Sequence, residues 1–401
     1  MINETFEYIQ KISLSNNYDK NFLKRLCLFD KIIKGDLPFK TDHGYNSSVS
    51  YTRVQHNRWA GPYFGFFNIV SGMTEDEMKT RAFFMTIMLS FFRLPFGGAF
   101  GILSLNVKTC KQELNDICKH FVENMSDNIG CTKDIFISDC SDTLVYHYNK
   151  ICPESWNTFL GKSYFNNGIL KRQYCFSFGV SMSILLWYQY FFQIDSMGQR
   201  FLFHGLDHRT KWIYQYLVTS LDMNCVGFTH QSNYYHCDHV SFEIISNFLD
   251  NPKGKFENIL LMPRESFWKS KTEVIIMGDS NEKFSEEILS WMSPKCKLLV
   301  EASFGSCGFP FDTRLKDLQI QLIPDIFAMS GEILASAIEY NVNETKEYWN
   351  TEIIKNKLIF QYEKAMHDFV RHLKKNGQYT NRHIFYSIGL YRLNKKLEIF
   401  G

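Results

Sequence analysis

The chain has 401 residues, of which 45% are hydrophobic and 21% are charged, and its formal net charge is +2. This composition excludes a disordered chain, and the small net charge gives no reason to expect nucleic acid or an anionic membrane as a partner. The length allows two or three domains, and the aromatic content of 16%, dominated by 37 Phe, is high.

Two features bear on where the protein resides. The 11 Cys are scattered singly, with no CxxC pair, which indicates reduced thiols in the cytoplasm rather than a disulfide framework. The N-terminal MINETFEYIQKIS is typical of neither a secretory signal nor a transit peptide. The uncharged segment 174–194 has the length of a membrane span, but its Ser and Gln residues favour a buried helix, so we expect no membrane insertion.

In the first third of the chain, helical and strand patterns alternate. Helical spacing covers 4–13 and 21–34, and alternation over 46–57 predicts a strand. A buried helix begins after Thr74, whose hydroxyl suits an N-cap, and a second helix is predicted over 111–125. Between these helices, RLPFGGAFGI (93–102) has the paired glycines of a tight turn, with a phenyl ring at its centre.

From about Gln199, short apolar runs alternate with helical ones, as expected of a parallel sheet wrapped by helices. The predicted strands are 201–205, 224–230, 273–279, 297–303 and 320–326, and the helices between them include 211–221 and 239–249. A long amphipathic helical pattern follows over 344–375. The predicted fold is α/β: an α+β substrate and assembly domain (1–172), a Rossmann-like doubly wound domain (173–340), and C-terminal helices (341–401) that return to the first domain.

Six segments make the chain resemble the glutamate dehydrogenase family of amino-acid dehydrogenases. They are RVQHNRWAGPYFGFF (53–67), MTIMLSFFRLPFGGAFGI (85–102), DIFISD (134–139), LVEASFG (299–305), IPDIFAMSGEILASAIEY (323–340) and NRHIFYSIGLYRLNKKLE (381–398). The resemblance extends over about 50–395 and implies the two-domain dehydrogenase fold, an amino-acid substrate and a nicotinamide cofactor.

At the positions where the resemblance implies substrate-binding and catalytic lysines, this chain has apolar residues. Phe64 and Met88 stand at the positions of two substrate lysines, and Phe100 stands at that of the catalytic lysine. Each hydrogen bond to a charged group is worth about 1.5–3 kcal/mol, so losing three removes roughly 5–9 kcal/mol of substrate binding. Phe176 replaces a cleft-facing threonine, and Ser336 matches a substrate contact.

Asp139 matches the family's catalytic aspartate and is the one catalytic-type residue that this chain retains. Residual proton transfer is one interpretation, and we favour the other, in which the carboxylate bonds local backbone N–H groups. If Asp139 lies beside Phe64 and Phe100, we expect burial to desolvate it.

The cofactor side has changed as well. The family's glycine-rich phosphate turn corresponds to Gly205–Thr210, in which Gly205 is kept and Asp207 and Thr210 replace the other two glycines. His230 stands where an acidic residue would bind the ribose, and Met329 replaces an asparagine that faces the nicotinamide. We therefore expect that NAD(P) binding is lost and that the chain has no cofactor. Arg209 and His208 could hold a phosphate, although such side chains are usually solvated.

Two further groups of residues carry less weight. His236, Cys237 and His239 fall in an apparent loop and lack the second ligand pair of a zinc site, so no metal is expected. Cys296 and Cys307 are interpreted as buried thiols rather than nucleophiles, because no histidine base accompanies them.

The favoured hypothesis is an inactive glutamate dehydrogenase-like pseudoenzyme with a structural, scaffold or regulatory role. The resemblance implies assembly through the first domain, so we expect a homo-hexamer, with further protein partners unidentified. Two alternatives stay open: a divergent NAD(P)-dependent amino-acid dehydrogenase, and a receptor for an apolar small molecule in the former cleft. Dinucleotide binding separates the first of these from a pseudoenzyme.

Overall fold

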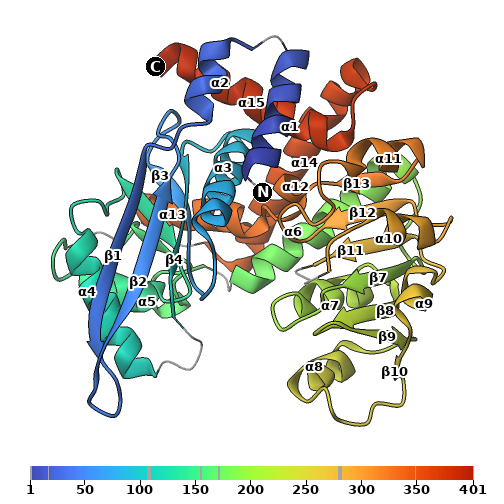
Figure 1. Cartoon of the computed structure of the whole chain (residues 1–401), viewed down its shortest axis with the longest axis horizontal. Coiled ribbons are helices and arrows are strands. Elements are labelled where there is room, and N and C mark those ends of the chain that lie inside the picture. The colour runs from blue at the N-terminus through green and yellow to red at the C-terminus, as the bar shows by residue number, and fades with distance from the viewer. Residues whose placement is uncertain are drawn as a thin grey trace. The chain divides into compact units, whose positions relative to one another are not determined.

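A computed structural model describes residues 2–16, 18–105, 110–153, 156–169, 172–278, 282–347 and 349–400. The chain forms two compact units (Figure 1). Unit 1 contains residues 1–171, 333–357 and 386–401, and unit 2 contains residues 172–332 and 358–385. The three C-terminal helices are each divided between the units, namely α13 (Gly331–Thr345), α14 (Thr351–Asn376) and α15 (Asn381–Phe400).

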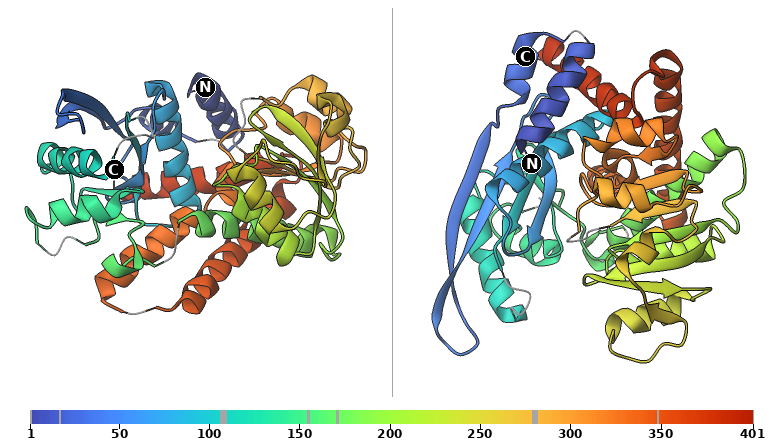
Figure 2. Two further views of the ribbon diagram at one scale, coloured as in Figure 1. Left: turned by 90° about the horizontal axis from the view of Figure 1, so that it is seen from below. Right: turned by 45° about the vertical axis from the view of Figure 1, so that its right-hand side comes forward.

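Unit 1 is built on a six-stranded mixed sheet with the order β1-β2-β4-β3-β5-β6. Its strands are β1 (Lys31–Lys40), β2 (Asn46–Gln55), β3 (Tyr63–Ile69), β4 (Gly97–Leu103), β5 (Asp134–Ile137) and β6 (Phe159–Leu160). The helices of its first part are α1 (Ile2–Ser15), α2 (Lys20–Leu26), α3 (Glu75–Phe91), α4 (Lys111–Met125) and α5 (Ser141–Tyr148), with a 3₁₀ turn η1 (Tyr164–Asn166). Helix α3 covers one face of the sheet, and α4 and α5 cover the other (Figures 1 and 2).

Local sequence explains where α3 begins. Thr74 and Glu77 form a capping box, in which each side chain bonds the other residue's backbone N–H, and three acidic residues fill the first turn.

The predicted helix over 21–34 is partly wrong, because α2 ends at Leu26 and Lys31 begins β1. Antiparallel pairing with β2 buries Leu37 on the α4 face, and this tertiary gain overrides the local helical spacing.

Unit 2 is a doubly wound α/β unit with the strand order β10-β9-β8-β7-β11-β12-β13. The five predicted strands are confirmed as β7 (Arg200–His204), β8 (Asn224–His230), β11 (Val274–Met277), β12 (Leu298–Glu301) and β13 (Gln321–Ile323), all parallel. The antiparallel strands β9 (Asn233–Cys237) and β10 (Ile259–Leu261) extend the sheet, so the loop expected around His236 and Cys237 is wrong.

Helices pack on both faces of this second sheet. They are α6 (Arg172–Trp187), continued by a π-helical turn η2 (Tyr188–Phe192), α7 (Lys211–Thr219), α8 (Phe242–Asp250), α9 (Arg264–Trp268), α10 (Glu286–Trp291), α11 (Phe311–Asp317) and α12 (Asp325–Ala328). The stretch Tyr174–Phe192 is long and apolar enough to cross a membrane, but 61% of its most apolar window is buried inside the protein. It is the core helix that the sequence predicts.

Candidate functional site

The glycine-rich segment that the sequence presents as a tight turn is strand β4, in the interior of the unit 1 sheet. Its glycines are required by close packing. A Cβ on Gly97 would lie 1.9 Å from the carbonyl oxygen of Asn57, and one on Gly98 would lie 2.2 Å from Thr86 Oγ1 on α3. Thr86 Oγ1 also accepts a hydrogen bond from the Gly98 N–H at 3.1 Å. The backbone path of β4 is therefore set by its neighbours, without any ligand.

The three positions implied to be lysines are all buried. Phe64 is 0% exposed, Met88 is 1% exposed and Phe100 is 1% exposed. The parallel register pairs Phe64 with Gly98, so Phe64 and Phe100 point to the same face of the sheet, which is the face covered by α3. These strands and this helix therefore gather the replaced positions on one side of unit 1.

Aromatic rings and one cation surround these positions. The ring of Phe64 stacks on Phe96 with centroids 4.4 Å apart, and Phe96 meets Tyr340 edge-on at 5.3 Å. The guanidinium carbon of Arg81, on α3, lies 5.4 Å from the centre of the Phe100 ring. Phe96 and Arg81 escaped the sequence analysis, although Arg81 lies seven residues before Met88 and therefore on the same helical face.

Asp139 and Ser336 lie in different surroundings. Asp139 follows β5 and is exposed, so the burial expected for it does not occur. Ser336 lies on α13 and is 3% exposed.

The turn between β7 and α7 is held by its own side chains. The Asp207 carboxylate accepts hydrogen bonds from the backbone N–H groups of Arg209 at 2.9 Å and Thr210 at 2.7 Å. The Thr210 hydroxyl donates to the same carboxylate at 2.8 Å and accepts from the Asp207 N–H at 2.8 Å. These N–H groups lie directly before α7, which begins at Lys211, and helix N-termini favour anions. Asp207 thus supplies from within the chain the negative charge that such a turn attracts.

Two residues at the end of β8 also bond the backbone of this turn. His230 is 7% exposed, and its Nδ1 lies 2.9 Å from the carbonyl oxygen of Leu206, so Nδ1 carries the proton and donates it. Thr229 Oγ1 accepts from the Gly205 N–H at 2.7 Å. Gly205 has φ +87°, which is the left-handed region that favours glycine, and this accounts for the one glycine kept in the turn.

Arg209 contacts two other side chains of unit 2. Arg209 Nη2 lies 3.3 Å from Glu332 Oε2, and the guanidinium carbon lies 4.7 Å from the centre of the Phe176 ring. Phe176 is 2% exposed and Glu332 is 3% exposed, so the arginine joins two buried side chains. Arg209 is thus half exposed to solvent and paired as well. Glu332 was missed, although it stands directly after the Met329–Gly331 turn. Met329 itself is 8% exposed.

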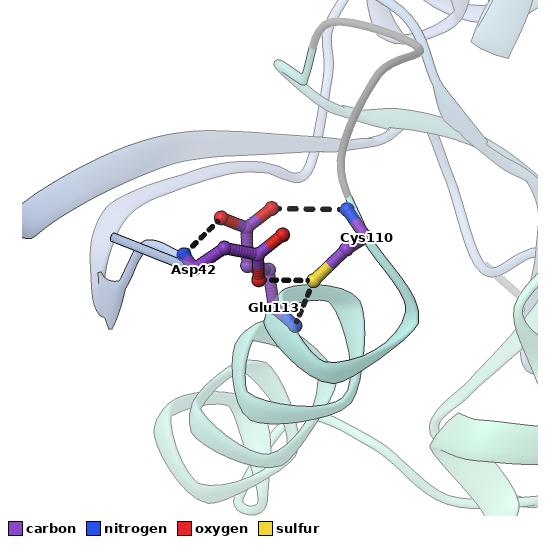
Figure 3. A group of neighbouring side chains, drawn as sticks. All are labelled: Asp42, Cys110 and Glu113. Carbon is purple, nitrogen blue, oxygen red and sulfur yellow. Dashed lines mark hydrogen bonds between the residues drawn. The ribbon is translucent and has the colours of Figure 1, made fainter. Parts of the chain in front are cut away.

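Among the described residues, one trio has side chains close enough to share a cation, namely Asp42, Cys110 and Glu113 (Figure 3). Its hydrogen bonds form a cap for α4. Cys110 Sγ accepts from the Glu113 N–H at 3.4 Å and donates to Asp42 Oδ1 at 2.7 Å, while Glu113 accepts from both the Cys110 and Asp42 N–H groups. The bond to Asp42 raises the pKa of the Cys110 thiol, which disfavours the thiolate that a metal requires.

The other cysteines and histidines weighed in the sequence do not form a site. Cys237 is buried on β9 and donates to the carbonyl oxygen of Cys225 at 3.5 Å, whereas its strand neighbour His236 is exposed. His239 is exposed beyond the strand. Burial raises the pKa of Cys296 to about 12 and also raises that of Cys307, which makes both thiols poor nucleophiles.

Comparison with known proteins gives the family. The profile of the Glu/Leu/Phe/Val dehydrogenase dimerisation domain matches residues 30–143, and that of Glutamate/Leucine/Phenylalanine/Valine dehydrogenase matches residues 240–399. The NAD-specific glutamate dehydrogenase of Clostridioides difficile is 24% identical over 393 residues, covering 92% of this chain and 91% of that protein. The NADP(+)-dependent glutamate dehydrogenase of Pyrobaculum calidifontis is 21% identical, covering 88% of this chain and 87% of its own.

Solved structures agree on the fold. The hetero-hexameric glutamate dehydrogenase of Thermus thermophilus, in its Leu-bound form, superimposes with a TM-score of 0.90 at 18% identity, covering 100% of this chain and 97% of that one. The glutamate dehydrogenase of Plasmodium falciparum has a TM-score of 0.83 at 17% identity and covers 100% of this chain and 95% of its own. The resemblance stated from the sequence is confirmed, and the chain belongs to the glutamate dehydrogenase family.

Proposed function

We propose that this chain is a non-catalytic member of its family, acting as a scaffold or regulatory subunit. The observation that carries the proposal is the phosphate turn, where Asp207 already accepts the N–H groups of Arg209 and Thr210. A dinucleotide pyrophosphate would have to displace this carboxylate or lie beside its charge, and both are unfavourable. NAD(P) binding is therefore lost in this proposal.

The substrate side supports the same conclusion. A dehydrogenase acting on glutamate needs positive groups for two carboxylates and a proton-transfer partner at the reacting carbon. Phe64, Met88 and Phe100 offer neither charge nor a titratable proton, and packing already covers all three. Asp139 remains, but a carboxylate cannot supply the positive groups that the reaction needs.

Direct binding measurements test the loss of cofactor. Titration calorimetry with NADH and NADPH at millimolar concentration is expected to give no saturable heat. Assays of 2-oxoglutarate reduction and glutamate oxidation with either cofactor are expected to stay at background, with the Clostridioides difficile relative as the positive control. Saturable binding with turnover overturns the proposal and supports the alternative of a divergent dehydrogenase. Binding without turnover contradicts only the proposed loss of NAD(P) binding and leaves the proposed loss of catalysis standing.

Assembly is the property that we propose the chain has kept. Strand β1 is an outer strand of the unit 1 sheet and, among the strands of the described residues, pairs with β2 alone, so part of its backbone is available to a second chain. We propose a homo-hexamer in the cytoplasm, where the free cysteines stay reduced. Mass photometry of the purified chain tests this, and a monomer at working concentration contradicts it.

Mixed assembly with an active relative is a second candidate. Its support is the likeness to the Thermus thermophilus enzyme, which is described as hetero-hexameric. Co-purification from the native cell separates the two cases, because a regulatory subunit brings a family member with intact lysine positions and a self-assembling scaffold does not.

A further inference from the structure

Two buried thiols in unit 1 have no part in the positions discussed above. Cys118 lies on α4 and is 1% exposed, and Cys140 is the N-cap residue of α5 and is 5% exposed. Both belong to one hydrophobic cluster, both are free, and their thiols are hydrogen-bond partners. Two thiols in contact can form a disulfide when one of them reacts as a thiolate.

The surroundings of Cys140 stabilise a thiolate. The Ser138 hydroxyl oxygen accepts from the Cys140 N–H at 3.4 Å, which leaves its hydrogen free to bond Cys140 Sγ at 3.1 Å. The N-terminus of α5 also favours negative charge at Cys140. Cys118 lies in the middle of α4, where a helix terminus has little effect, so it is the thiol that keeps its proton and donates it to Cys140 Sγ.

The electrostatics distinguish the two thiols in the same way. The hydrogen bonds from Cys118 and Ser138 lower the pKa of the Cys140 thiol, against burial and the negative charge of the neighbouring Asp139, which raise it. The bond to Cys140 and burial raise the pKa of Cys118. Cys140 is also the thiol nearer to solvent, because it follows the exposed Asp139. An attacking thiolate needs this access, whereas a resolving thiol needs only contact with its partner.

We propose that Cys140 and Cys118 form a redox modification site, at which a hydroperoxide converts the two thiols into a disulfide. The Cys140 thiolate attacks one oxygen of hydrogen peroxide, an S–O bond forms, the O–O bond breaks, and hydroxide leaves and takes up the proton that Cys140 gave up. The Cys118 sulfur then attacks the resulting sulfenic sulfur, the S–O bond breaks, and hydroxide leaves with the Cys118 proton as water. Two thiols and one peroxide thus give one disulfide and two waters.

The disulfide joins α4 to the start of α5, and both helices cover the same face of the unit 1 sheet (Figures 1 and 2). An S–S bond of about 2.05 Å is shorter than a contact between two thiols, so closing it draws the two helices together. Disulfides in the cytoplasm are usually transient and respond to oxidants, and thiols of the glutathione type reverse them. The site rests on unit 1 alone and is independent of whether the chain binds a dinucleotide.

Peptide mapping tests the proposal, because trypsin places each of the two thiols in a peptide with no other cysteine. Cys118 lies in 112–119 and Cys140 lies in 134–150. The reduced chain is treated with hydrogen peroxide, its remaining thiols are alkylated, and it is digested. The two peptides are expected to be linked with the loss of two hydrogens, about 2 Da, and to separate on reduction. If both peptides stay alkylated at every peroxide concentration that leaves the chain folded, the proposal is overturned.

Variants assign the roles of the two thiols. Cys118→Ser is expected to leave a sulfenic acid on Cys140, which dimedone labels, whereas Cys140→Ser leaves Cys118 unlabelled. Ser138→Ala removes a hydrogen-bond donor to Sγ and is expected to slow disulfide formation roughly two- to tenfold. Labelling of Cys118 in the Cys140→Ser variant contradicts the assignment of the attacking thiol. An unchanged rate in Ser138→Ala contradicts the proposed activation of Cys140.

A second pair of neighbouring thiols is a matched control. Cys225 on β8 and Cys237 on β9 are also buried, and Cys237 Sγ donates to the Cys225 carbonyl oxygen at 3.5 Å. Contact with Cys225 and burial raise the pKa of Cys237, and both cysteines lie on strands, away from any helix N-terminus. Both are in the tryptic peptide 212–253, which is expected to stay doubly alkylated at the peroxide concentration that links Cys118 to Cys140. Equal oxidation of both pairs contradicts the proposal, because it shows that contact alone suffices.

Discussion

The replaced positions of unit 1 and the turn between β7 and α7 in unit 2 satisfy their side chains in opposite ways. In unit 1, Phe64, Met88 and Phe100 substitute apolar side chains, and close packing covers them. In unit 2, two charged side chains of the turn are satisfied by their own neighbours: Asp207 by backbone N–H groups and Arg209 by Glu332. A site can thus be closed by removing charge or by supplying a partner from within, and the two solutions respond differently to mutation.

The largest expected effect is in unit 1. Phe100→Lys places a cation at a position that is 1% exposed and near Arg81, and an uncompensated buried charge costs about 3–5 kcal/mol. We expect that loss in chemical denaturation, without any gain of dehydrogenase activity. Phe100→Leu, which keeps the position apolar, is the control and is expected to cost about 1.5 kcal/mol or less. If the lysine variant is as stable as the leucine variant, the interpretation that position 100 is buried in an apolar environment is contradicted.

Buried charge in unit 2 is expected to show in the pH dependence of stability. Glu301 is 0% exposed and bonds Arg382 Nη1 at 2.7 Å, while Asp312 and Asp325 lie in the same cluster. Burial, with the two further carboxylates, raises the pKa of Glu301 from 4.5 to about 7 against the opposing effect of Arg382.

Because the pKa of Glu301 is raised in the folded state, the folded protein binds this proton more tightly than the unfolded chain does. The contribution of Glu301 to the free energy of unfolding is therefore complete below about pH 4.5 and is lost as the pH rises through about 7. We expect the free energy of unfolding to fall by about 2–3 kcal/mol across that window and to change less in Glu301→Gln. Urea denaturation at matched pH values measures both proteins. Parallel pH profiles of the two would show that Glu301 does not titrate there.

A smaller effect is expected at the phosphate turn. Asp207→Ala removes a carboxylate that accepts from the N–H groups of Arg209 and Thr210, directly before α7, and hydrogen bonds to a charged group are worth about 1.5–3 kcal/mol. The freed N–H groups are expected to bind an added anion, so sulfate should raise the melting temperature of this variant more than that of the unmodified chain. Asp238→Ala, at an exposed position in unit 2, is the control. Equal responses to sulfate would show that the carboxylate does not occupy an anion site.

The smallest effect concerns Arg209. Its side chain is 49% exposed, so loss of the pair with Glu332 in Arg209→Ala is expected to cost less than about 1 kcal/mol. Arg314→Ala, which breaks an exposed pair with Glu286, is a matched control with an effect closer to zero. Thermal denaturation of both variants gives the comparison, and a larger loss in Arg314→Ala would show that the buried partner contributes nothing.

The sequence predicts the fold well because its strongest signals are long and local. Five apolar runs become the parallel strands of unit 2, and the motifs around Phe64 and Phe100 identify the family. Strand β9 was missed because Asn233–Cys237 mixes polar and aromatic residues, and only Tyr235 and Cys237 among them are buried.

The contacts within the candidate site are harder to predict. Arg209 and Glu332 lie 123 residues apart in the chain, and no local pattern indicates that they meet. The glycines of β4 pointed to a turn because glycine commonly occupies positive φ, whereas here it permits two backbones to approach within a sheet.

Asn57 and Thr86 leave no space for a side chain at Gly97 and Gly98, and this holds whichever residue stands at position 100. Selection on folding alone can therefore preserve these two glycines, with or without catalysis. Surveys that count dehydrogenases in genomes by that signature would include this chain among them. The residue between Ala99 and Gly101 is the one to inspect, since the resemblance implies a catalytic lysine there and this chain has a phenylalanine.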